Sequence, residues 1–150
     1  MECNTSNMNI RLASEKDAAV LADLNRKFNK THDTEQQVAA RTETNPLAEI
    51  AFVAEVEGIV VGFACLRVTR SICYEFALAE LTELYIDESY RRRGVGRALI
   101  EQAELVAQEQ GAESLMLLTG AKNLTAQEFY RSAGYQVLQD LVMNKKLADR

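Results

Sequence analysis

The sequence has 150 residues, of which 47% are hydrophobic and 26% are charged, and this length and composition suit a single compact domain. Lys and Arg number 17 against 22 Asp and Glu, so the formal net charge of −5 argues against a general nucleic-acid binder. Three cysteines without C-x-x-C spacing and a single histidine argue against a disulfide framework, a zinc site or a histidine metal cluster.

The first residues, MECNTSN, are polar and lack the apolar stretch of a signal peptide. The longest apolar runs, such as IVVGFACL, are too short to span a bilayer. We therefore expect a cytoplasmic protein without membrane association. The predicted organisation is a flexible extension over residues 1–7 and one domain over residues 8–150.

The first predicted elements are a strand and two helices. Residues 8–12 favour a short strand, and Ser14 followed by Asp17 forms a capping box that starts a helix. Apolar residues then recur at helical spacing and predict a buried stripe: Val20, Leu21, Leu24 and Phe28. A more polar helix is predicted over residues 34–43, and Pro46 ends it.

The middle of the chain predicts strands. Residues 50–57 and 59–68 are rich in β-branched and apolar side chains, and Gly58 between them predicts an antiparallel hairpin. A loop or ragged strand extension is predicted over residues 69–79. The stretch ELTELYID, residues 80–87, predicts another strand.

The second half is predicted to contain a helix over residues 96–110, a strand over 114–118, a helix over 125–133 and strands over 135–138 and 141–147. The full order is β-α-α-β-β-β-α-β-α-β-β. One strand–helix–strand unit in a largely antiparallel chain predicts an α+β fold, with a mixed sheet flanked by helices.

The run YRRRGVGRALI lies between the strand at residues 80–87 and the helix at residues 96–110. It therefore presents backbone N–H groups at a helix N-terminus, where anions bind. Gly94 and Gly96 let a phosphate approach the backbone, and the surrounding arginines can add charge-assisted hydrogen bonds. The ligand best suited to this loop is a pyrophosphate. A Walker A loop is excluded because no GK[ST] follows, and a Rossmann fingerprint is poorly matched because the third glycine is missing.

A second motif, NLTAQEFYRSAGYQ, follows downstream. Thr125 and Glu128 form a predicted capping box, and Leu124 and Phe129 form a hydrophobic staple across it. These features fix the start of the helix and therefore the direction of Tyr130. The alternative is that Tyr130 is a core aromatic residue at helical spacing.

The stretch ELTELYIDESYRRRGVGRAL followed by NLTAQEFYRSAGYQ resembles the GNAT superfamily of N-acetyltransferases, and FVAEVEGIVVGFACL and VMNKKL are similar to other strands of that family. The resemblance implies acetyl-CoA as the cosubstrate and no metal. It implies that the strand backbone pairs with the pantetheine arm at Leu84, Tyr85 and Ile86. The pyrophosphate would bind at Arg91, Arg92, Arg93, Gly94, Val95, Gly96 and Arg97. Asn123 matches a cofactor contact, and Tyr130 matches the usual general acid, beside the bound CoA.

Acetyl transfer to an amine needs a base, because an alkyl amine with a pKa of about 10.4 arrives mostly protonated. Glu83 is the first choice for this base, Glu80 is the second, and an ordered water could relay the proton. Strand alternation puts the two glutamates on opposite faces, although a β-bulge would change that parity. The alternative is that both are edge charges beside a solvated loop. A backbone N–H near Ile86 would stabilise the oxyanion, and the Tyr130 phenol would protonate the leaving thiolate.

Acidic residues around this strand favour a cationic acceptor: Glu75, Glu80, Glu83, Asp87 and Glu88. The prediction is an amine N-acetyltransferase acting by direct attack in a ternary complex on a cationic small molecule, such as an aminoglycoside or a polyamine. The alternatives are a protein or peptide amine as the acceptor, and a non-catalytic acyl-CoA-binding module. The resemblance implies a homodimer, and the net charge argues against nucleic acid as a partner.

Overall fold

The computed structural model describes residues 7–44 and 49–149. The predicted helix stop at Pro46 and nearly all of the predicted N-terminal extension lie outside these ranges. The chain divides into two compact units, Met1–Leu118 and Thr119–Arg150, and each is described by itself. The single domain expected from the sequence stays a prediction.

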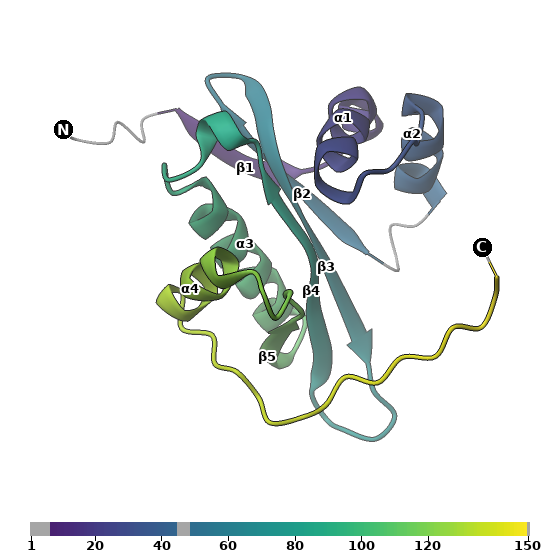
Figure 1. The fold of residues 1–150 in the computed structure, drawn as a ribbon, viewed down its shortest axis with the longest axis vertical. Helices are drawn as coiled ribbons and strands as arrows, with labels where there is room; N and C mark the ends of the chain where they lie inside the picture. Colours follow the sequence, from purple (N-terminus) through teal and green to yellow (C-terminus); the bar gives the residue numbers. More distant parts are fainter. Residues whose placement is uncertain (1–6, 45–48, 150) are drawn as a thin grey trace. The chain divides into compact units, whose positions relative to one another are not determined.

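The first unit is built on a five-stranded sheet (Figure 1). Its elements in chain order are β1 (Met8–Leu12), the 3-10 helix η1 (Glu15–Asp17), α1 (Ala18–Asn29), α2 (Glu35–Thr44), β2 (Ile50–Val56), β3 (Ile59–Arg70), β4 (Ala77–Ile86), the 3-10 helix η2 (Glu88–Tyr90), α3 (Val95–Glu109) and β5 (Ala112–Leu117). The strands pair in the order β1-β2-β3-β4-β5, and only β4–β5 is parallel. The predicted α+β class with a largely antiparallel sheet is confirmed.

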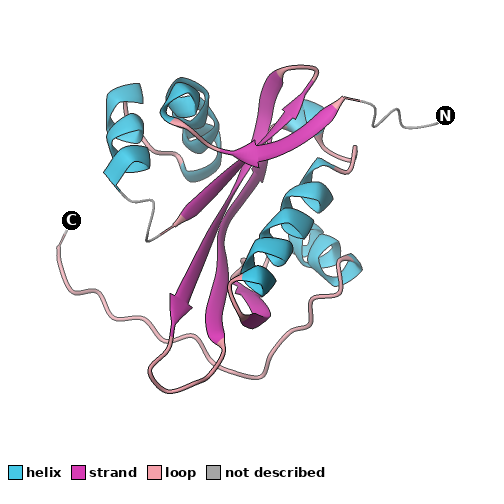
Figure 2. Ribbon diagram, turned by 180° about the vertical axis from the view of Figure 1, so that it is seen from behind, coloured by secondary structure: helices cyan, strands magenta, loops and turns pink. Residues whose placement is uncertain are grey.

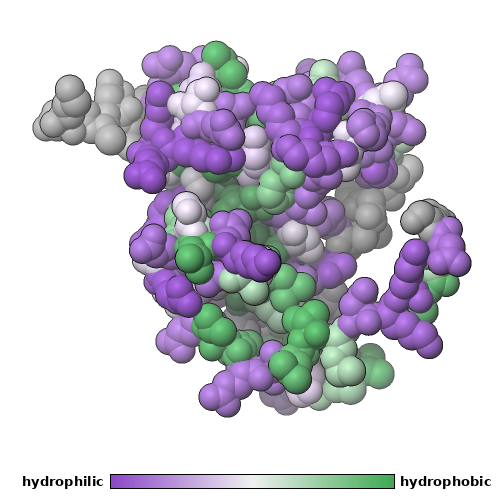
Figure 3. Space-filling model, in the orientation of Figure 1, coloured by the Kyte–Doolittle hydropathy of each residue, from purple (hydrophilic) through white to green (hydrophobic). Residues whose placement is uncertain are grey.

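Helices cover both faces of this sheet (Figures 1 and 2). α1 and α2 pack together on one face, and α3 lies along the other. The outer surface of α1 and α2 is mostly hydrophilic (Figure 3), so the apolar stripe of α1 faces the sheet, as its spacing predicts. No helix in the described part of the chain is long and apolar enough to cross a membrane.

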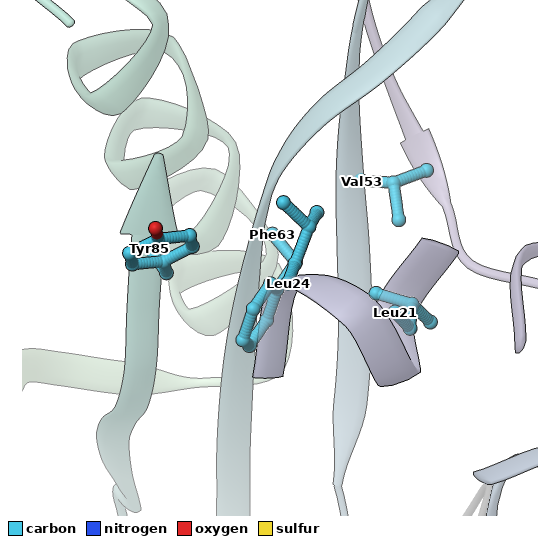
Figure 4. Packing of buried hydrophobic residues seen from close by; sticks show 5 residues of the cluster. All are labelled: Leu21, Leu24, Val53, Phe63 and Tyr85. Atoms are coloured by element: carbon cyan, nitrogen blue, oxygen red, sulfur yellow. The ribbon is translucent and has the colours of Figure 1, made fainter. Parts of the chain in front are cut away.

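A row of apolar side chains crosses the sheet beneath α1. Val53, Phe63 and Tyr85 lie opposite one another on β2, β3 and β4. Leu21 and Leu24 of α1 pack onto this row (Figure 4). Because each buried side chain of this size contributes about 1.5–3 kcal/mol, the row fixes α1 over the strands.

The opposite face of the sheet carries a second apolar layer. Phe52 and Leu66 of the sheet are almost fully buried, as are Leu99 and Ile100 of α3. This layer lies between the sheet and α3. It holds the N-terminus of α3 close to the end of β4, from which the arginine- and glycine-containing loop departs.

An ion-pair network joins η1 to the first two strands, β1 and β2. The guanidinium of Arg11 binds Asp17 with two N–O distances of 2.7 and 2.8 Å, and it also contacts the carboxylate of Glu55. Asp17 accepts a further hydrogen bond of 2.8 Å from the N–H of Ser14, as the predicted capping box requires. Arg11 holds the pKa of Asp17 below its usual range, against the opposing effect of burial.

The second unit contains α4 (Leu124–Ser132) followed by a segment without strands in its described residues. The strands predicted over residues 135–138 and 141–147 are therefore wrong. A strand needs a neighbour for its backbone groups, and β-propensity mostly reflects packing against such neighbours. The apolar side chains that favoured strands are exposed instead: Val137, Leu138, Leu141, Val142, Met143 and Leu147.

We expect Asp17→Asn to lower the free energy of unfolding by about 2–4 kcal/mol, because it breaks a mostly buried ion pair from one side. Urea unfolding at pH 7 measures this change. The control is Asp23→Asn, which removes only exposed contacts on α1 and should cost less than about 0.5 kcal/mol. Equal costs for the two variants would contradict the assignment.

The same network predicts an acid dependence of stability. The folded pKa of Asp17 is lowered, so its contribution is complete above the unfolded pKa of about 3.9 and is lost as the pH falls through the folded value. The unfolding free energies of wild type and Asp17→Asn should therefore draw together as the pH falls below about 4. A constant difference from pH 7 down to pH 2 would contradict this.

Candidate active site

The parallel pairing of β4 and β5 ends partway along β4. The last pair is Leu81 opposite Leu117, whereas β4 remains paired with β3 as far as Ile86. Residues 82–86 therefore have one edge without a strand neighbour in the described part of the chain. The residues predicted to pair with pantetheine lie on this open edge: Leu84, Tyr85 and Ile86.

β4 carries a β-bulge at Thr82. Cys65 of β3 lies opposite Glu83, and the next residue, Leu66, lies opposite Leu81. Thr82 is therefore an extra residue in β4, and the alternation of side chains shifts at this point. The bulge follows directly on the last β4–β5 pair, so the strand changes its alternation where its edge opens.

This bulge brings the two predicted glutamates to the same face of the sheet. Glu80 lies opposite Arg67, and Glu83 lies opposite Cys65. Cys65 and Arg67 are two residues apart on β3 and share its face with Phe63, which α1 covers. Simple alternation, which separates the glutamates, therefore gives the wrong answer here.

The two glutamates have different partners. Glu80 forms an ion pair with Arg67 of β3. Glu83 accepts a hydrogen bond of 3.4 Å from Nδ2 of Asn29, the last residue of α1. Within the described residues, Glu83 has no salt bridge, whereas the charge of Glu80 is balanced by Arg67.

Glu49 is a third carboxylate at this site, and sequence reasoning missed it. The hydroxyl of Thr82 contacts Glu49 and lies 3.2 Å from the carbonyl oxygen of Cys65. Burial raises the pKa of the Cys65 thiol, and the charges of Glu49 and Glu83 raise it further. The thiol therefore stays protonated and is a poor nucleophile. No sequence pattern marks Glu49, because its approach depends on the bulge.

Gly62 allows β3 to approach the end of β4 closely. A Cβ atom at Gly62 would lie 2.8 Å from the carbonyl oxygen of Tyr85 and 2.9 Å from Cδ1 of Ile86. A larger residue would push the two strands apart. Gly62 therefore fixes the position of the last residues of β4.

Two arginines of the loop after η2 fold onto aromatic rings. Arg91 donates from Nε to the carbonyl oxygen of Ile86 at 2.9 Å, and its guanidinium lies 5.5 Å from the centre of the Tyr85 ring. The guanidinium of Arg93 lies 5.1 Å from the ring centre of Tyr90. These cation–π contacts place both arginines against the protein.

The backbone of the same loop is open to an anion. Arg92 and Gly94 have positive φ angles of 61° and 80°, and Val95 begins α3 as a buried anchor. The N–H groups of Val95 and Gly96 in the first turn have no acceptor within the helix. Arg97 pairs with a glutamate one turn further along. The loop therefore offers backbone N–H donors at the predicted pyrophosphate site.

In the second unit, Asn123 caps α4. Its Oδ1 accepts a hydrogen bond of 3.1 Å from the N–H of Ala126. The predicted capping box of Thr125 and Glu128 is wrong, because asparagine is at least as good an N-cap as threonine and lies two residues earlier. The cap uses the side-chain oxygen of Asn123 and not its amide nitrogen.

Tyr130 lies in α4 among aromatic neighbours. Its ring centre is 5.4 Å from that of Phe129 and 5.9 Å from that of Tyr135. Burial raises the pKa of the Tyr130 phenol above its usual value of about 10. The phenol therefore keeps its proton at neutral pH, as a general acid must.

An open strand edge can bind an extended chain of amides, and the helix N-terminus that follows it can bind a pyrophosphate. Together these features define a protein suited to an acyl-CoA ligand. The chain belongs to the acetyltransferase (GNAT) family, whose model matches residues 18–135. This family uses acetyl-CoA as its cosubstrate, and the resemblance found in the sequence is confirmed.

Two curated relatives illustrate the match. An uncharacterised N-acetyltransferase of Methanocaldococcus jannaschii is 38% identical over 86 residues, which are 57% of this chain and 38% of that protein. The uncharacterised N-acetyltransferase YhfO of Bacillus subtilis is 29% identical over 136 residues, which are 86% of this chain and 90% of that protein. The chain thus spans nearly all of YhfO but less than half of the archaeal protein.

Solved structures share the fold. An aminoglycoside acetyltransferase from an uncultured soil metagenomic sample, in complex with sisomicin, has a TM-score of 0.81 and 21% identity, covering 97% of this chain and 99% of that one. The aminoglycoside N-acetyltransferase AAC(6')-Iy in complex with CoA has a TM-score of 0.81 and 19% identity, covering 94% and 95%. At this identity the likeness establishes the fold.

We expect Gly94→Arg to weaken acetyl-CoA binding at least tenfold in calorimetry, because the new side chain projects from the turn where a phosphate must approach. The matched control is Gly58→Arg in the β2–β3 turn. Both glycines have φ of 80°, and a Cβ atom added at either would meet nothing within 4 Å, so both substitutions carry the same backbone strain. Equal binding by the two variants would contradict the phosphate site.

Proposed function

We propose that the protein is an N-acetyltransferase that moves the acetyl group of acetyl-CoA to a primary amine. The observation that supports this proposal most is the open edge of β4 beyond Leu81, which leads directly into the N-terminal turn of α3. The pantetheine amides would pair with that edge at Leu84, Tyr85 and Ile86. The pyrophosphate would bind the backbone between Arg91 and Arg97.

The proposed reaction is a direct attack in a ternary complex. Glu83 takes a proton from the ammonium group of the acceptor, and the neutral nitrogen attacks the thioester carbonyl. A C–N bond forms and the C–S bond breaks, while a backbone N–H near Ile86 stabilises the oxyanion. The leaving CoA thiolate takes a proton from the phenol of Tyr130, and the second proton that the nitrogen loses as the amide forms restores the phenol through solvent. The raised pKa of the Tyr130 phenol supports this role, because the phenol then holds its proton at neutral pH.

A cationic small molecule is the proposed acceptor. Glu80 and Asp87 are balanced by ion pairs with Arg67 and Lys27, whereas the charges of Glu49 and Glu83 both act on the Cys65 thiol between them. These two carboxylates favour a substrate with more than one ammonium group. Aminoglycosides and polyamines have that character, and sisomicin is an aminoglycoside bound by one of the structural neighbours.

The proposal includes a homodimeric, cytoplasmic enzyme. A protein or peptide amine is the alternative acceptor, because the same carboxylates would also attract an N-terminal ammonium group. A non-catalytic acyl-CoA-binding module is the alternative of a different class. It would bind CoA and acetylate no amine.

The test measures release of the CoA thiol from acetyl-CoA with three acceptors: sisomicin, spermidine and an alanine-terminated peptide. We expect sisomicin or spermidine to be acetylated at least tenfold faster, by kcat/KM, than the peptide. A faster peptide reaction would favour the alternative acceptor. Calorimetric binding of acetyl-CoA without turnover of any amine would overturn the enzymatic proposal.

We expect Tyr130→Phe to lower kcat about 100-fold with little change in the KM for acetyl-CoA, because only protonation of the thiolate is lost. The wild-type kcat should not fall on the alkaline side below about pH 10, since the raised pKa keeps the phenol protonated. The control is Tyr74→Phe, an exposed tyrosine stacked on Phe76. A loss shared by both variants would contradict the assignment.

A further inference from the structure

The last turn of α1 contacts the end of β4 and the residue that follows it. Nζ of Lys27 lies 2.9 Å from a carboxylate oxygen of Asp87. The ring of Phe28 stacks on Tyr85 with centres 5.1 Å apart. Asn29 donates a hydrogen bond from Nδ2 to Oε2 of Glu83 at 3.4 Å. Three consecutive helix residues thus contact Glu83 and Tyr85 on one face of β4 and Asp87, the residue directly after the strand.

Asn29 is itself held in place by its neighbours. Its Nδ2 also donates to Oδ1 of Asn25 at 2.7 Å, and Nδ2 of Asn25 donates to the hydroxyl of Thr31 at 3.2 Å. A side-chain amide has two N–H donors. One donor of Asn29 is fixed on α1 by Asn25, and this directs the other towards Glu83.

We propose that Asn29 is a positioning residue that orients the Glu83 carboxylate for proton transfer, an inference that rests on the proposed function. The amide of Asn29 binds Oε2 and so restricts rotation of the carboxylate. Oε1 then remains to accept the ammonium proton of the acceptor. Phe28 and Lys27 hold the backbone of α1 at the distance that this contact requires.

Other charged and titratable groups around Glu83 are already accounted for. Cys65 on β3 keeps its proton, because burial raises the pKa of its thiol. Glu80 is paired with Arg67. Glu49, before β2, is the remaining carboxylate, and the hydroxyl of Thr82 contacts it. Asn29 is therefore the neutral donor on Glu83, and converting it to an acid places a second negative charge there.

The experiment compares Asn29→Ala and Asn29→Asp with wild type, using whichever of sisomicin, spermidine or the alanine-terminated peptide is acetylated fastest. We expect Asn29→Ala to lower kcat about tenfold with an unchanged KM for acetyl-CoA. Asn29→Asp should move the acidic limb of the kcat/KM profile upward by about one pH unit, because like charges oppose ionisation. Asn9→Ala, an exposed asparagine on β1, is the matched control and should match wild type.

A double-mutant cycle separates positioning from folding. Asn29→Ala in a Glu83→Gln background should change kcat less than twofold, because a positioning residue acts only through the group that it positions. A tenfold further loss in that background, or wild-type rates and an unshifted pH profile for both Asn29 variants, would overturn the role of Asn29. Glu83→Gln with wild-type activity would overturn it too and leave the transferase intact. A wild type that acetylates none of the three amines would overturn the proposed function itself.

Discussion

The separation of β4 from β5 after Leu81 is the constraint on which the site depends. A strand within a sheet satisfies its backbone groups through both neighbours, and an edge that loses one must find other partners. β4 loses its second neighbour over residues 82–86, while Gly62 keeps its first neighbour, β3, in close contact there. At the end of this edge, Arg91 donates a hydrogen bond to the carbonyl oxygen of Ile86. The intervening backbone is then a template for an extended ligand of matching length.

The bulge at Thr82 determines how Glu83, the proposed base, is oriented relative to this edge. Without the extra residue, Glu83 would point to the α3 side, away from Asn29 and away from the proposed acceptor. With it, one face of β4 presents Glu83 and Tyr85 to the last turn of α1, which also contacts Asp87 directly after the strand. The backbone proposed to bind acetyl-CoA and the proposed base thus lie on one strand, and the bulge sets their relative orientation.

Sequence patterns predicted the strand and helix order up to α4 because hydrophobic periodicity reports burial, and burial formed most of these elements. The bulge could not be predicted in this way, since ELTELYID is compatible with unbroken alternation and the extra residue shows only in the pairing with β3. The start of α4 was misplaced because two good N-caps, Asn123 and Thr125, stand close together. The prediction of two strands after α4 was wrong for a different reason. The apolar residues there have strand propensity, but propensity does not supply a neighbouring strand to pair with.

The arginines of the loop also make contacts within the protein. Arg91 and Arg93 lie on the rings of Tyr85 and Tyr90, and Arg97 pairs within α3. Backbone donors and a helix dipole act over a short range and do not depend on net charge. A net charge of −5 is therefore compatible with the proposed pyrophosphate site, and the carboxylates near β4 would attract the proposed cationic acceptor.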